Sequence, residues 1–135
     1  MMETRVKVGI VSCSGEERPE GTVCRMACRR LLEQETDKTV TICLPLFIAG
    51  GREERTFATK YPTITVDGCE KRCAARATET LSAKPRMTLL IPEILRKHGL
   101  AVPEKRRDYG PDEEPVIRAV IEELAAAVDE VLAKA

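Results

Sequence analysis

Residues 6–15 have the sequence VKVGIVSCSG, and this stretch decides the fold class. Its apolar run is short and is followed at once by Ser and Gly, a pattern that predicts a buried strand ending in a tight loop. Residues 19–35 then show helical periodicity, with an apolar side made by Val23, Ala27, Leu31 and Leu32. A buried strand followed by an amphipathic helix is the unit from which parallel sheets are built.

The alternation of strand and helix continues along the chain. Further strands are predicted at residues 39–44, 63–66 and 87–91, and further helices at 69–81, 93–98 and 116–134. Gly50-Gly51 marks a turn or a helix start, and residues 99–115 form a charged surface connection where mobility is expected. We therefore expect an α/β fold, a single three-layer Rossmann-like domain with about four mostly parallel strands and helices on both faces. Its parts are cysteine-bearing βα units (6–100), a charged loop (101–115) and a C-terminal helix (116–135).

The composition limits the classes of partner. Lys plus Arg and Asp plus Glu number 22 each, so the chain lacks the bulk charge that binding to nucleic acid or to an anionic membrane needs. Arg25, Arg29 and Arg30 could form a local basic patch, but they are more simply the solvated face of a helix. Because there is no Trp and there are only two Phe, we expect an aliphatic core.

The cellular compartment expected for the protein decides how its six cysteines are interpreted. No segment approaches the roughly 20 apolar residues that span a bilayer, and Lys7 interrupts the first apolar run, which is typical of a strand and not of a signal peptide. We therefore expect a cytoplasmic protein. In that reducing compartment such a set of cysteines favours metal binding or catalysis over disulfides. The simpler alternative is that all six are small buried hydrophobic residues.

Four cysteines lie at or just after the ends of three predicted strands. In a parallel sheet these ends share one edge, where α/β folds bind ligands. The four residues are Cys13, Cys43, Cys69 and Cys73. On a helix, Cys69 and Cys73 would stand on one face with Cβ atoms about 5–6 Å apart, within reach of one zinc ion at about 2.3 Å from each sulfur. A helix N-terminus also lowers the pKa of a thiol, and amides of the Gly15 and Gly68 turns could offset the charge of four thiolates.

Cys24 and Cys28 lie within the first predicted helix, and Cys28 shares a face with Leu31 and Leu32. They are interpreted first as small apolar residues packed against the sheet. The alternative is that Cys24, near the helix start, joins or replaces a metal ligand.

The sequence resembles the DGC-domain family, which is named for Asp-Gly-Cys. The resemblance rests on Asp67-Gly68-Cys69 followed by Cys73-Ala74, on the Cys13-Ser14-Gly15 loop and on Cys43-Leu44, with Gly50 also in register. It covers roughly residues 6–100. It implies a zinc-binding protein whose ligands are Cys13, Cys43, Cys69 and Cys73. It assigns no role to Cys24 or Cys28.

Other motifs support fewer conclusions. Cys13 and Arg18 are separated by four residues, whereas the phosphate loop of low-molecular-weight phosphatases needs five, and Glu16 and Glu17 would repel a phosphate. These two glutamates are interpreted as solvated loop charges, or as general bases if the site is catalytic. Asp67 is a second-shell acceptor, a catalytic base or, more simply, a turn or cap residue.

The chain contains neither a Cys-x-x-Cys motif nor a dinucleotide or Walker glycine pattern. His98 is the only histidine and is expected to cap a helix end before Gly99, so a two-histidine zinc site is excluded.

Three functions are compatible with these residues. The preferred one is a zinc site that shapes the fold or that serves metal binding, sensing or delivery. The alternative is an iron–sulfur or persulfide centre of a thiol or sulfur-transfer enzyme or carrier. The third is a catalytic zinc held by three cysteines with an exchangeable water.

Overall fold

The computed structural model describes residues 6–135, which form a parallel sheet with helices on both faces. The strands are β1 (Val8–Ser12), β2 (Thr39–Thr41), β3 (Thr63–Asp67) and β4 (Met87–Leu90). The α-helices are α1 (Pro19–Gln34), α2 (Leu46–Ala49), α3 (Phe57–Lys60), α4 (Cys73–Leu81), α5 (Ile91–Lys97) and α6 (Glu114–Ala133). Two short 3₁₀ turns, η1 (Glu54–Thr56) and η2 (Pro111–Glu113), precede α3 and α6.

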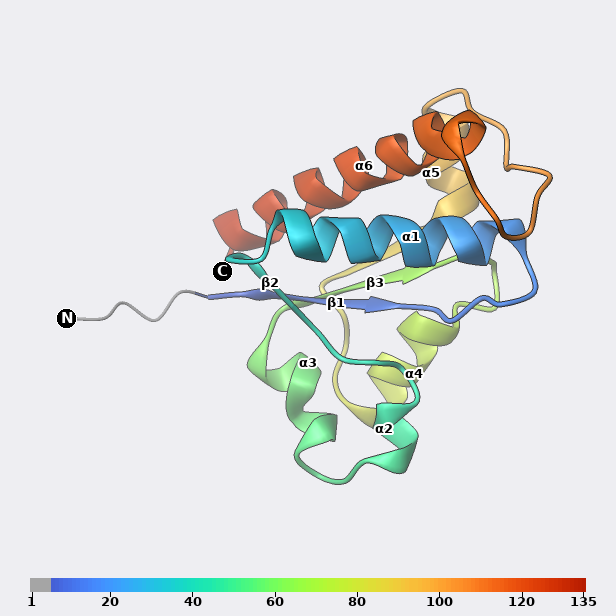
Figure 1. Ribbon diagram of the computed structural model, residues 1–135. Helices are drawn as coiled ribbons and strands as arrows, with labels where there is room; N and C mark the ends of the chain where they lie inside the picture. Colours follow the sequence, from blue (N-terminus) through green and yellow to red (C-terminus); the bar gives the residue numbers. More distant parts are fainter. Residues whose placement is uncertain (1–5) are drawn as a thin grey trace.

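All strand pairs in the sheet are parallel, and the strand order is β2-β1-β3-β4. Ile10 of β1 pairs with Thr41 on one side and with Ile64 on the other. Helices α1, α5 and α6 cover one face, and α2, α3 and α4 cover the other (Figure 1). The predicted three-layer α/β fold with four parallel strands is therefore confirmed.

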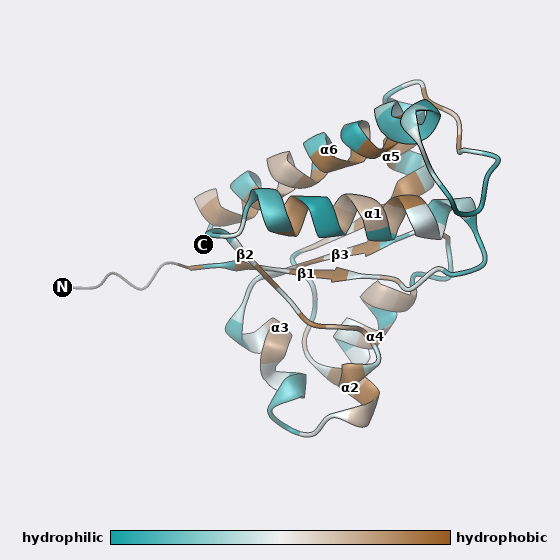
Figure 2. Cartoon of the chain, viewed as in Figure 1, coloured by the Kyte–Doolittle hydropathy of each residue, from teal (hydrophilic) through white to brown (hydrophobic). Residues whose placement is uncertain are grey.

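The core differs between the two faces of the sheet. Under α1 and α6 it is aliphatic, as predicted, and the apolar sides of these helices face the sheet in Figure 2. On the other face, Phe47 is fully buried and its ring centroid lies 6.5 Å from that of Phe57, which in turn lies 5.3 Å from that of Tyr61. The prediction of a purely aliphatic core is thus wrong on this face, because the few aromatic residues cluster there. Within residues 6–135 no helix combines the length and the apolarity needed to cross a membrane.

The predicted helix over residues 69–81 begins only at Cys73. Residues 69–72 instead form a turn, in which the Arg72 N–H donates to the Cys69 carbonyl at 3.0 Å. Arg72 has a left-handed φ of 51°, which a helix interior does not allow. Cys69 and Cys73 therefore do not share a helix face, and the argument from an i, i+4 pair is wrong.

Other boundaries shift for local reasons. β2 ends at Thr41 instead of Leu44, because this edge strand pairs only with β1. Ile91 belongs to α5 and not to β4, since Pro92 occupies the first helical turn, where its missing N–H costs nothing. The predictions also missed η1 and α3, which carry Phe57 over Gly9 of β1.

Three glycines bring two loops and a helix into backbone contact at the carboxyl edge of the sheet. A Cβ atom on Gly21, in the first turn of α1, would collide with the Gly15 carbonyl oxygen. A Cβ atom on Gly68, in the β3–α4 loop, would lie 2.9 Å from the Gly21 nitrogen. Gly15 also has a left-handed φ of 42°. We call Gly15, Gly21 and Gly68 the glycine contact; it fixes the loops that carry Cys13 and Cys69.

We predict that Gly21→Ala destabilises the protein by about 2 kcal/mol or more, the range expected for overpacking against a rigid neighbour. Alanine is intrinsically the better helix residue by roughly 1 kcal/mol. A net loss of stability would therefore show that the collision with the backbone outweighs this gain in helix propensity. Urea unfolding measures the change. Gly110→Ala is the control, because nothing lies within 4 Å of its Cβ position and its φ is −131°. A Gly21→Ala protein as stable as this control would contradict the prediction.

Candidate metal centre

The four cysteines predicted as ligands lie at the carboxyl edge of the sheet. Cys13 follows β1, Cys43 follows β2, Cys69 follows β3 and Cys73 begins α4. Cys13 is buried, Cys69 is half-buried, and the other two are exposed. The parallel topology therefore delivers all four to one rim.

Three of these cysteines share the wall of one hollow of about 300 Å³, the first hollow. Cys13, Cys69 and Cys73 line it, together with Leu44 and Gly68. Its lining also includes Arg18 and Asp67 as the only charged residues.

Cys43 lies on a second hollow of about 270 Å³. Its walls include Cys13 and Cys28 as well, and Leu44 borders both hollows. Cys13 is thus the thiol that the two hollows have in common.

Within residues 6–135, no three Cys, His, Asp or Glu side chains stand close enough together to hold a metal ion. The structure therefore brings Cys13, Cys69 and Cys73 to one hollow and Cys43 to the adjoining one, and a shared ion stays a prediction. The donor chemistry nevertheless fits a thiophilic metal, because four sulfurs line adjoining walls, where Asp67 is bound to the α4 backbone and Glu16 lies 3.8 Å from Arg25. Two of them, Cys43 and Cys73, are exposed and can change rotamer without disturbing the core.

Cys13 is held by the end of β3. Its backbone N–H donates to the Val66 carbonyl at 3.0 Å, and its Sγ accepts from the Gly68 N–H at 3.3 Å. The Gly68 N–H, which is expected to offset thiolate charge, thus contacts this sulfur. A hydrogen bond with the Cys24 thiol and burial both raise the pKa of Cys13 well above its usual range. Without a metal, Cys13 is therefore a neutral thiol, and a bound ion would have to displace its proton.

Cys24 and Cys28 are buried in α1, with exposed fractions of 0% and 2%. The Cys24 thiol donates to the Val66 carbonyl at 3.2 Å. The hydrogen bond with Cys13 lowers the pKa of Cys24, but the Cys28 thiol and burial outweigh it and raise that pKa overall. Both residues belong to the hydrophobic core, and Cys24 binds the same Val66 carbonyl that accepts the Cys13 N–H.

Asp67 is buried, and both of its carboxylate oxygens bind the backbone of α4. Oδ1 accepts from the Ala74 N–H at 2.7 Å, and Oδ2 accepts from the Ala75 N–H at 3.1 Å. Burial raises the pKa of Asp67, although these two hydrogen bonds oppose the rise. Of the roles considered from sequence, the cap role is the one that its contacts show, and it positions Cys73 at the start of α4.

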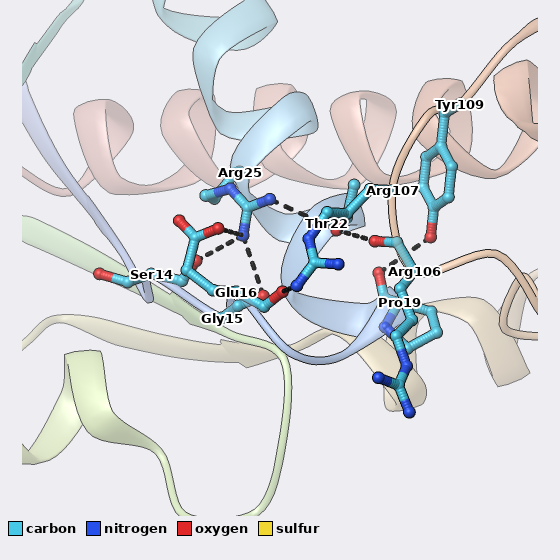
Figure 3. A network of polar contacts seen from close by, with 9 residues as sticks. All are labelled: Ser14, Gly15, Glu16, Pro19, Thr22, Arg25, Arg106, Arg107 and Tyr109. Carbon is cyan, nitrogen blue, oxygen red and sulfur yellow. Dashed lines mark hydrogen bonds and ion pairs between the residues drawn. The ribbon is translucent and has the colours of Figure 1, made fainter.

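A guanidinium and a surface segment hold the Cys13 loop from the α1 side (Figure 3). Arg25 donates to the Ser14 carbonyl at 2.5 Å and to the Gly15 carbonyl at 2.9 Å, and it lies 3.8 Å from the Glu16 carboxylate. Arg30 is paired with Glu114 at 2.6 Å. Two of the three arginines expected on a solvated face thus make specific contacts.

Residues 105–110, which we call the strap, cross the start of α1. The Thr22 hydroxyl donates to the Arg106 carbonyl, and Arg107 donates to the Glu16 carbonyl at 2.9 Å. The Tyr109 hydroxyl lies 3.2 Å from the Pro19 carbonyl and 2.8 Å from the Lys105 carbonyl. The charged connection is on the surface, as predicted, but these contacts tie it to the Cys13 loop.

His98 lies away from this rim, at the end of α5, where its Nε2 is 2.9 Å from Glu123 of α6. Sequence reasoning missed Gly21 and the strap. A glycine in the first turn of a helix is a detectable signal, since it disfavours the helix unless a close contact requires it. The strap gives no comparable signal in the sequence. Its contacts are largely to backbone carbonyls, which every residue has, so the partner positions require no particular residue type.

We predict that Asp67→Ala destabilises the protein by about 2–4 kcal/mol, because two buried N–H groups would lose a charged acceptor. Asp67→Asn should recover part of that stability, since its amide oxygen can still accept one of the two hydrogen bonds. Thermal unfolding of the metal-free proteins measures both changes. Equal stability of the Ala and wild-type proteins would show that the carboxylate does not cap α4.

The comparison with family models gives one match, to the DGC domain, over residues 9–128. Neither the curated proteins nor the solved structures provide a match. The matched region extends beyond the residues 6–100 expected from the resemblance and includes most of α6. Because the family model covers most of the chain and contains the whole cysteine-bearing rim, the protein belongs to the DGC-domain family.

Proposed function

We propose that this protein binds zinc through the thiolates of Cys13, Cys43, Cys69 and Cys73, and that it serves metal sensing or delivery. The observation that carries the proposal is that Cys13, Cys69 and Cys73 line one hollow and that Cys13 and Cys43 line the next. Zinc accepts four thiolates in tetrahedral sites, and it deprotonates a thiol that it binds.

The donor set favours a thiophilic ion over a hard one. Magnesium and calcium require oxygen ligands, and the only carboxylate on the first hollow, Asp67, is already committed to the α4 backbone. Four thiolates on a divalent ion would carry excess negative charge. The Gly68 N–H, which already donates to Cys13, supports that charge, and Arg18 lines the same hollow.

A role in sensing or delivery is supported by the exposure of the ligands. Cys43 and Cys73 are exposed, so a competing thiol or protein could exchange with them. The hydrophobic core runs from β1 through α1 to α6 and does not include Cys43, Cys69 or Cys73. The fold therefore has its own source of stability, unlike small domains that are unfolded without zinc.

We predict that single changes of the four cysteines to Ser weaken zinc binding by more than about 100-fold, beyond the loss typical of a changed second-shell residue. Protein purified without oxygen should be colourless and contain zinc by elemental analysis. Competition with a chromophoric chelator measures the affinities, and cobalt(II) spectra report tetrahedral thiolate ligation.

Cys28→Ser is the matched control, since it replaces the same atom at a buried position. It should bind zinc within about tenfold of wild type, less than a ligand loss costs. A brown protein that contains iron and sulfide would establish the iron–sulfur alternative instead, which the all-cysteine donor set also suits. If one of the four Ser variants binds zinc as tightly as wild type, that cysteine is not a ligand and the site has only three.

We also predict that removal of the metal leaves the protein folded. A chelator should lower the melting temperature by no more than mass action of the ion explains, because a ligand stabilises the state that it binds more tightly. Far-ultraviolet circular dichroism of the chelated protein should keep its helical signal. Loss of that signal at room temperature would show that the ion has a structural role.

A further inference from the structure

The chain holds a second thiol directly behind the candidate metal centre. Cys24 lies in α1, and its Sγ–H donates to the same carbonyl oxygen, that of Val66, that accepts the Cys13 backbone N–H. The two distances are 3.2 Å and 3.0 Å. The Cys24 thiol is also the largest single cause of the raised pKa of Cys13, as expected of neighbouring groups. The Val66 carbonyl at the end of β3 therefore holds the Cys24 sulfur and the Cys13 backbone next to each other.

Access to the two sulfurs is unequal. Cys13 is 8% exposed and borders both hollows, whereas Cys24 is fully buried. A small reagent can therefore reach Cys13 first, and Cys24 is its nearest reaction partner on the inner side. If the metal ligands are Cys13, Cys43, Cys69 and Cys73, then Cys24 has no role in metal ligation.

We propose that Cys13 and Cys24 form an oxidisable pair, in which Cys24 is the resolving thiol and their disulfide withdraws Cys13 from the metal centre. The disulfide itself depends only on the two thiols. The withdrawal of a ligand rests on the proposed zinc function.

The oxidant is a low-molecular-weight disulfide. The Cys13 sulfur, as thiolate, attacks one sulfur of the reagent and expels the other as a thiolate, which forms a mixed disulfide. The Cys24 sulfur then attacks the Cys13 sulfur and expels the second reagent thiolate. The protein loses two protons and two electrons, and the reagent gains them as two thiol groups.

The reaction is expected to be slow. Cys13 is only 8% exposed and Cys24 is fully buried, so a disulfide reagent seldom reaches the attacking sulfur. The pair would thus respond to sustained oxidation rather than to a brief pulse. The equilibrium between dithiol and disulfide is unaffected by this rate, and it is the quantity to measure.

Cys28 competes as a partner for Cys24, since the Cys28 thiol also contacts it. Both lie on α1 and both are buried, and a reagent in the first hollow meets neither of them. Cys28 also lines the second hollow, so the test below must distinguish its linkages from that of Cys13 with Cys24. A bond between Cys13 and Cys24 would join β1 to α1 where the glycine contact already holds them together.

The test uses the full chain with Cys43, Cys69 and Cys73 all changed to Ser, which leaves Cys13, Cys24 and Cys28. This protein is equilibrated without oxygen in mixtures of oxidised and reduced dithiothreitol, quenched in acid and alkylated. Cleavage after Glu17 and after Arg25 places the three cysteines on separate peptides, so mass spectrometry identifies each linkage. We expect two of the three thiols to be lost, as a Cys13–Cys24 linkage, with Cys28 alkylated.

A Cys24–Cys28 linkage, or three free thiols even in fully oxidised reagent, would overturn the proposal. This outcome is independent of zinc, because the three substitutions remove most of the proposed ligands. A Cys13–Cys24 linkage in this variant, together with a wild-type chain that takes up no zinc, would refute the proposed function alone.

The effect on the metal centre is measured on the wild-type chain loaded with zinc. Oxidised dithiothreitol should release zinc more slowly from Cys24→Ser than from wild type, and Cys24→Ala checks that a buried hydroxyl is not the cause. Equal rates of release from folded wild-type and variant proteins would overturn the coupling between the pair and the metal centre.

Discussion

The backbone contact of Gly15, Gly21 and Gly68 is the constraint on which the functional edge depends. No side chain separates the Cys13 loop, the first turn of α1 and the β3–α4 loop at this point. The Gly68 N–H can therefore reach the Cys13 sulfur, and α1 lies close enough to β3 for Cys24 to bond the Val66 carbonyl. Because Gly15, Gly21 and Gly68 have no side chains, the Cys13 loop, α1 and the Cys69 loop can approach closely. This close approach positions the sulfurs of Cys13 and Cys24 and the loop that carries Cys69.

The cysteines at this rim differ in how firmly the surrounding structure holds them. Cys13 is held by β1, by the Gly68 amide and, through its loop, by Arg25 and the strap. Cys43 lies on the connection after an edge strand, and Cys73 lies exposed at a helix start. One sulfur is therefore fixed in the core, while the sulfurs around it are free to reorient. Such a division suits a site that gains and loses an ion more than one that is closed permanently.

Much of the fold could be predicted from sequence because its strongest patterns are local. The apolar run of β1, the stripe of α6 and the buried β3 each specify their own structure, and alternation alone gives a parallel sheet. The start of α4 could not be predicted in this way. Residues 69–81 have helical composition, yet the Asp67 carboxylate caps the helix at Cys73, and Arg72 takes a left-handed conformation. That boundary is set by a side chain outside the helix, which periodicity does not register.

The candidate site, too, could be predicted from sequence only in part. Strand ends predict that Cys13, Cys43 and Cys69 reach one edge, because topology fixes edges. Topology does not fix which hollow a side chain faces, and Cys43 faces the second one. The contact of Cys24 with Cys13 is likewise invisible in sequence, since it depends on how closely α1 approaches β3.

Burial decides the chemical difference between the cysteines of this protein. A thiol beside another thiol in a dry environment has a raised pKa, so Cys13 and Cys24 react slowly in the metal-free protein. A divalent ion at the rim would reverse this at Cys13, since its charge stabilises the thiolate more than burial opposes it. Cys24 has no such compensation and would remain a thiol. The same pair of sulfurs would then differ in charge and reactivity according to whether the ion is bound, which couples occupancy of the rim to the chemistry behind it.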